Sequence, residues 1–117
     1  ATVKSFVRAK TTGRTILITD AIAAAGCPAG RYRLGQTEVE LDESGRVSPP
    51  GKPWLAGSAL TMPGAVANTV RFTGLPLDAV LSMAIDVPAS YLGMKPRGLV
   101  TAQWDEEAQD LKILSVA

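Results

Sequence analysis

Histidine is absent from this 117-residue chain, and cysteine occurs once, at Cys27. Without histidine the chain cannot form a Ser-His-Asp or Cys-His catalytic arrangement, and it lacks the commonest zinc ligand. A single cysteine cannot form an intramolecular disulfide, so folding does not depend on an oxidising compartment, and we expect a cytoplasmic protein. Any catalysis must therefore rest on a carboxylate, the thiol, or groups supplied from elsewhere.

Long apolar runs and clusters of one charge are also missing. The 12 Lys+Arg nearly balance 11 Asp+Glu, and the formal net charge is +1. Nucleic acid is not an expected partner, because phosphate binding needs clustered Lys and Arg. No stretch reaches the roughly 18 consecutive apolar residues of a membrane span, so no membrane partner is expected either. A chain that is 46% hydrophobic and 20% charged is typical of one globular domain, or of a piece of a larger one.

Apolar periodicity predicts an αβ unit at the start of the chain. Residues 2–10 place Val3, Phe6 and Val7 on one helical face. Residues 15–19 (TILIT) are β-branched and apolar without alternation, which is typical of a parallel strand covered on both faces. A turn is predicted over residues 21–27. Because Ala1 leads directly into the first helix with no preceding segment, we expect the chain to be part of a longer protein.

The hydrophobic period changes to two at Gly30, which predicts an antiparallel β-meander as far as about residue 48. Residues 48–53 (SPPGKP) are too rich in proline for a regular strand. Helices are predicted over residues 61–73 and 77–85, followed by a turn over 88–92. Two strands are predicted at the end, over residues 99–104 and 111–116, joined by a polar connector.

Two features are candidates for a functional site. Asp20 directly follows the predicted buried strand, at the end where barrel and open-sheet enzymes place their chemistry. An Asp before an alanine-rich stretch is equally the pattern of an ordinary helix N-cap. Residues 55–62 (LAGSALTM) form an apolar loop before a helix, and Gly57 permits close approach of a ligand to the backbone. The alternative for this loop is a turn whose Ser or Thr caps the helix.

Three motifs taken together resemble the N-acetylglucosamine-6-phosphate deacetylase family of the metal-dependent amidohydrolase superfamily. They are residues 16–26 (ILITDAIAAAG), residues 30–35 (GRYRLG) and residues 55–62 (LAGSALTM), in that order and spacing. The resemblance continues through residues 65–68, 76–83 and 88–89. It covers about residues 2–98 and corresponds to the C-terminal third of the family.

The resemblance implies an α/β fold, namely the C-terminal part of a (β/α)8 metal-dependent hydrolase barrel together with strands of a small β domain. Residues 1–98 would belong to the barrel, with a β-meander insertion at about 30–48, and residues 99–117 would be the C-terminal strands of the small β domain. Residues 15–20 would be the eighth barrel strand. By position, Asp20 would be the catalytic aspartate, and Leu55, Ala56 and Gly57 would contact the sugar phosphate substrate.

The reaction implied is hydrolysis of N-acetylglucosamine 6-phosphate to glucosamine 6-phosphate and acetate in the parent protein. The resemblance also implies a divalent metal, zinc or iron, whose ligands lie in earlier strands of the barrel, so we expect no metal to be bound by this chain alone and the fragment to be inactive. Expected partners are the amino sugar phosphate, the remainder of the barrel and, through the apolar strand, a second copy of the chain in a homo-oligomer. The alternatives are a small non-catalytic α/β binding module and another amidohydrolase that acts on a different amide.

Overall fold

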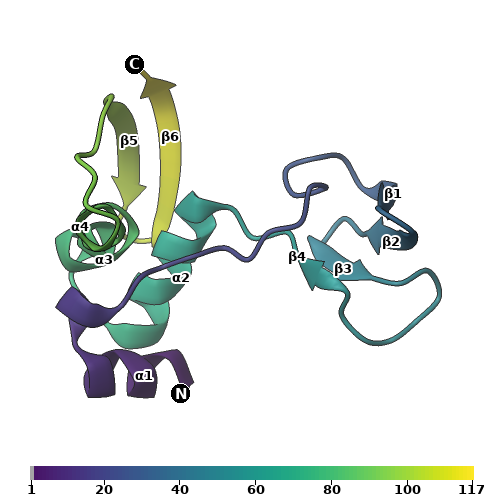
Figure 1. The fold of residues 1–117 in the computed structure, drawn as a ribbon, viewed down its shortest axis with the longest axis horizontal. Helices are drawn as coiled ribbons and strands as arrows, with labels where there is room; N and C mark the ends of the chain where they lie inside the picture. Colours follow the sequence, from purple (N-terminus) through teal and green to yellow (C-terminus); the bar gives the residue numbers. More distant parts are fainter. Residues whose placement is uncertain (1) are drawn as a thin grey trace. The chain divides into compact units, whose positions relative to one another are not determined.

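The computed structural model describes residues 2–117, which form two compact units. The first unit combines residues 2–18 with residues 62–117, and the second consists of residues 19–61. The second unit is therefore an insertion between two parts of the first. Figure 1 shows the helices and a C-terminal two-stranded ribbon in the first unit, and short strands in the second.

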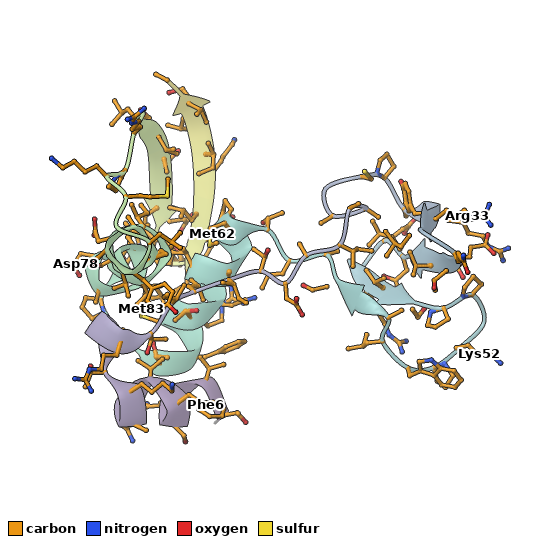
Figure 2. The ribbon with its side chains drawn as sticks, viewed as in Figure 1. Phe6, Arg33, Lys52, Met62, Asp78 and Met83 are labelled. Atoms are coloured by element: carbon orange, nitrogen blue, oxygen red, sulfur yellow. The ribbon has the colours of Figure 1, made fainter. Side chains whose placement is uncertain are left out.

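The first unit packs helices around a small apolar core. Its elements are α1 (Thr2–Lys10), the 3-10 turn η1 (Thr12–Arg14), α2 (Met62–Thr73), α3 (Leu77–Ala84), α4 (Asp86–Tyr91), β5 (Val100–Asp105) and β6 (Asp110–Val116). Val66 and Val70 of α2 meet Val80 of α3 at the centre, and Leu17, Trp104 and Leu111 pack against them. Met83 of α3 is fully buried within this unit (Figure 2).

Strands β5 and β6 form a two-stranded antiparallel ribbon whose register runs from Val100–Val116 to Asp105–Asp110. Arg71 of α2 connects the helices to this ribbon, since its guanidinium donates to the Gln109 carbonyl at 3.3 Å. The apolar side chains of the ribbon beyond Trp104 and Leu111 are largely exposed, among them Val100, Leu114 and Val116.

The second unit is a four-stranded antiparallel meander in the order β1 (Gly30–Leu34), β2 (Thr37–Leu41), β3 (Arg46–Ser48) and β4 (Gly57–Ser58). Val39, Leu41 and Val47 are buried at its centre. The opposite face carries charged side chains, and Arg33 points outward into solvent (Figure 2). This division follows from the alternation of apolar and charged residues, because successive side chains of a strand point to opposite faces.

Residues 15–19 do not form the predicted covered strand. Thr15 has extended torsion angles, but the segment has no ladder partner among residues 2–117. Its backbone hydrogen bonds run from Thr15 N–H to the Thr12 carbonyl at 3.2 Å and from Leu17 N–H to the Met83 carbonyl at 2.9 Å. Leu17 packs on the core, whereas Ile16 and Ile18 are 38% and 66% exposed. The predicted β-strand is therefore wrong for this structure. Both-face burial was wrong for this structure, because no described segment lies beside it to supply strand hydrogen bonds.

The other predicted helices and strands are confirmed within a few residues. The first helix has the predicted bounds, but of its apolar face Val7 alone is buried, while Phe6 is exposed. Helix α2 ends before Gly74. The turn predicted over residues 88–92 is wrong, because most of it lies in helix α4, which ends at Tyr91. The domain boundary expected at residue 98 stays a prediction.

Candidate functional site

Asp20 lies in an unusual backbone conformation at the start of the second unit. Its φ angle is +52°, a left-handed value that residues other than glycine rarely adopt. Its side chain is exposed, and the Ala21 N–H next to it donates to Thr19 Oγ1 at 3.3 Å. Rare backbone angles outside glycine concentrate at functional sites, where surrounding contacts hold them.

Asp20 does not cap a helix. Residues 23–26 form a turn rather than a helix, and Ala25 N–H bonds to the Ile22 carbonyl at 3.0 Å and Cys27 N–H to the Ala24 carbonyl at 3.1 Å. The amide two residues after Asp20 is also committed elsewhere, since Ile22 N–H bonds to Ser58 at 2.8 Å. The N-cap interpretation of Asp20 is therefore wrong, and its carboxylate is not used to begin a helix.

The segment after Asp20 is paired with the loop of residues 55–58 (LAGS). Ala21 forms a parallel β-bridge with Ser58, and the Ile22 N–H donates to the Ser58 carbonyl at 2.8 Å. Ile22 also packs against the core formed by Val39, Leu41 and Val47. The two features that the sequence singled out separately are thus neighbours in one unit.

Gly57 makes this pairing possible. It has a φ of +150°, and a β-carbon at this position would stand 2.5 Å from Ile22 Cγ2. Any larger residue would have to displace Ile22 or the loop. The glycine is therefore required because the Ile22 side chain lies directly against the loop backbone, whereas the sequence predicted only close approach of a ligand.

The three predicted substrate-contacting residues present different groups. Leu55 is 67% exposed, so its side chain is available to a ligand. Ala56 packs its side chain against the core, and its N–H is committed to the Val47 carbonyl at 2.9 Å. Gly57 is paired with Val47 in the sheet. Of the three, Leu55 is the residue that offers a free side chain.

A groove of about 530 Å³ runs along this loop. Leu55, Gly57 and Ser58 line it together with Arg46, while Asp20 is not among its lining residues. The Arg46 guanidinium donates to the Pro53 carbonyl, which ties β3 to the loop before Leu55. Larger hollows, of about 790 and 580 Å³, lie in the first unit along α4, and neither is lined by Asp20, Leu55, Ala56 or Gly57.

The turn between β2 and β3 is organised by Asp42. Its carboxylate accepts hydrogen bonds from the Ser44 hydroxyl at 2.6 Å, from the Ser44 N–H at 2.9 Å and from the Arg46 N–H at 3.0 Å. The Ser44 hydroxyl, followed by the Arg46 amide, lowers the pKa of Asp42, because these donors favour the charged carboxylate. The turn thereby fixes the start of the strand that carries Arg46.

Comparison with known proteins identifies the chain's relatives. No protein-family model matches the sequence. It is 40% identical to N-acetylglucosamine-6-phosphate deacetylase of Lysinibacillus sphaericus, and the match covers 80% of this chain and 24% of that protein. It is 43% identical to a putative N-acetylgalactosamine-6-phosphate deacetylase of Escherichia coli, and that match covers 69% of this chain and 47% of that protein. An aspartate-to-alanine variant of the Mycobacterium smegmatis N-acetyl-D-glucosamine-6-phosphate deacetylase, solved with N-acetyl-D-glucosamine-6-phosphate, superposes with a TM-score of 0.76 at 28% identity, over 97% of this chain and 32% of that one.

The chain is a partial region of the N-acetylglucosamine-6-phosphate deacetylases. It spans about a quarter of the Lysinibacillus sphaericus protein and about a third of the Mycobacterium smegmatis chain. The recognised motifs and the shared fold therefore concern this region alone.

Residues 2–117 of this deacetylase region contain no group of three or more His, Cys, Asp or Glu side chains placed to hold a metal ion. A catalytic zinc site takes three protein ligands, so the described residues do not fit such a site by themselves. The same residues contain no helix long and apolar enough to cross a bilayer.

Sequence reasoning assigned no functional role to two residues, namely Thr19, which lies within the motif of residues 16–26, and Arg46. Arg46 stands between Gly45 and Val47 in a three-residue strand, and no local pattern distinguishes it. Thr19 is hidden in the β-branched run of residues 15–19. The signal that could have indicated Thr19 is its position directly before Asp20, at the end of the apolar run.

Proposed function

We propose that the protein containing this chain hydrolyses the acetamide of N-acetylglucosamine 6-phosphate, giving glucosamine 6-phosphate and acetate. The observation that carries the proposal is the pairing of Ala21 and Ile22 with Ser58, which brings the Asp20 segment beside the LAGS loop. The deacetylase relatives support the same reaction. In this proposal the chain is the C-terminal part of a (β/α)8 barrel, with residues 99–117 in a small β domain.

Asp20 is the proposed proton carrier. Hydrolysis requires water to lose a proton as its oxygen adds to the amide carbon, and the amine nitrogen to gain a proton as the C–N bond breaks. One carboxylate performs both transfers when it first accepts the water proton and then donates it to the leaving amine. Asp20 is suited to this role because its carboxylate is exposed and does not cap a helix.

The LAGS loop is the proposed contact for the sugar phosphate. Leu55 supplies an exposed apolar side chain, and Arg46 lines the same groove with a cation that suits an anionic ligand. Ala56 and Gly57 are both paired with Val47, and this pairing fixes the position of the loop backbone that would contact the ligand. The divalent metal that the family resemblance implies would be held by residues outside this chain, and a cytoplasmic location stays a prediction.

A second substrate has support from one relative. The putative Escherichia coli enzyme, at 43% identity, is named for N-acetylgalactosamine 6-phosphate, which differs from the first substrate in the configuration of one hydroxyl. Both sugars carry the same acetamide and phosphate, so the chemistry proposed for Asp20 is unchanged. The remaining alternatives are a different amide and a non-catalytic binding module.

The test is turnover of both sugar phosphates by the full-length protein, measured as acetate release. We expect deacetylation by the native protein and a kcat lower by about 10²-fold in Asp20→Asn, because proton transfer in both directions is lost. Glu43→Gln, an exposed carboxyl in the same unit, is the matched control and keeps native kcat. Native turnover with an unimpaired Asp20→Asn variant rules out the role of Asp20, and absence of turnover of either sugar rules out the proposed function.

A further inference from the structure

Thr19 and Ala21 form a hydrogen-bonded bracket across Asp20. The Ala21 N–H donates to Thr19 Oγ1 at 3.3 Å, so the hydroxyl of one residue and the amide of the other close a short turn around the aspartate. Thr19 is half-buried, whereas Asp20 and Ala21 are exposed. Ser and Thr side chains commonly stabilise turns in this way.

The backbone of Asp20 needs such a constraint. A left-handed φ is uncommon at a residue other than glycine and persists where surrounding contacts enforce it. On the downstream side, Ala21 and Ile22 are held through Ser58. Among the described residues, the bond from Ala21 to the Thr19 hydroxyl is the hydrogen bond that spans Asp20 itself.

We propose that Thr19 is a positioning residue for Asp20, whose hydroxyl holds the aspartate in its left-handed conformation and so fixes where the carboxylate lies. The inference rests on the proposed deacetylase function of Asp20. Thr19 touches neither substrate nor water in this role and acts through the backbone of its neighbour. Removing the hydroxyl lets Asp20 relax toward a common backbone conformation and moves the carboxylate away from its place in the reaction.

The experiment compares two variants of the full-length protein. Thr19→Val keeps the branched shape and removes the hydroxyl, whereas Thr19→Ser keeps the hydroxyl and removes the methyl group. We expect Thr19→Val to lower kcat about 10-fold with KM within about twofold, since misplacing a catalytic group by an ångström can cost up to about 10²-fold. Thr19→Ser retains most of the native kcat. Thr37→Val, at an exposed position of β2, is the control for the substitution itself.

Amide hydrogen exchange at Ala21, measured by residue-resolved mass spectrometry on the same proteins, reports on the hydrogen bond from the Ala21 N–H to the Thr19 hydroxyl independently of enzyme activity. Thr19→Val accelerates this exchange, and Thr19→Ser leaves it near the native rate. A native kcat in Thr19→Val, an equal loss of kcat in both variants, or an unchanged Ala21 exchange rate overturns the proposal. These results differ from failure of the proposed function, in which the native protein itself does not release acetate.

Discussion

Gly57 lies against Ile22 so closely that a β-carbon on the glycine would stand 2.5 Å from Ile22 Cγ2. This contact joins the segment that follows Asp20 to the loop that carries Leu55. Because Ile22 also packs on the core of the second unit, it cannot move aside without disturbing that core.

Gly57→Ala is therefore expected to destabilise the second unit by about 1–3 kcal/mol, the usual cost of overpacking combined with a backbone angle that alanine tolerates poorly. Urea unfolding of the chain measures the change. Gly13→Ala is the control, because a β-carbon there meets nothing within 4 Å. Adding Ile22→Ala to Gly57→Ala should cost less than the sum of the two single changes, and strict additivity would contradict the contact.

Stability of the chain is expected to fall as the pH drops through the pKa of Asp42. That pKa is lowered in the folded protein, so the contribution of Asp42 to stability is present above its unfolded value of about 3.9 and is lost on acidification. Asp42→Asn should be less stable than the native chain at pH 6, and the difference in stability between the two proteins should narrow toward pH 2. Urea midpoints across this range provide the measurement, with Glu43→Gln as the control. A difference that stays constant with pH would mean that the Asp42 charge has no part in stability.

The isolated 117-residue chain is expected to release no acetate from N-acetylglucosamine 6-phosphate, with or without added zinc or iron. The reason is that residues 2–117 do not group three metal-ligating side chains and the chain contains no histidine. The assay is the same acetate measurement used for the full-length protein. Turnover by the purified chain would show that the described residues suffice for the reaction.

Ile16 and Ile18 are expected to drive self-association of the isolated chain. They project from an extended segment without a ladder partner, and an unpaired apolar strand is a template for pairing with another chain. Light scattering coupled to size-exclusion chromatography should show a dimer or larger species, and Ile18→Lys should shift it toward monomer. Ala9→Lys, at an exposed position of α1, should not. A native chain that remains monomeric at high concentration would contradict this prediction.

Most of the fold could be predicted from hydrophobic periodicity. The meander follows from the alternation of Tyr32, Leu34, Val39 and Leu41 with charged residues, and each of these side chains lies in or against the core of the second unit. Gly74 marked the end of α2 for a local reason, since it has a φ of +71°. Such signals are carried by the residues themselves and do not depend on distant partners.

Residues 15–19 show where periodicity fails. An apolar run indicates what a segment would bury, but the hydrogen-bond partners that make it a strand come from elsewhere in the fold. The candidate site was predictable only in part, because some of its contacts also depend on residues distant in the sequence. The motifs indicated Asp20 and the LAGS loop. The β-bridge between Ala21 and Ser58 joins residues far apart in the sequence, so no local pattern predicts it.

The insertion of residues 19–61 between two parts of the first unit has a consequence for synthesis on the ribosome. The meander pairs residues that are close in sequence and can form as soon as its last strand emerges, because local contacts form fastest. Helix α1 is made before this insertion, yet its packing partner among the described residues, α2, begins only at Met62. Within this chain, the contact between α1 and α2 that buries Val7 can therefore form only after the whole insertion has been made.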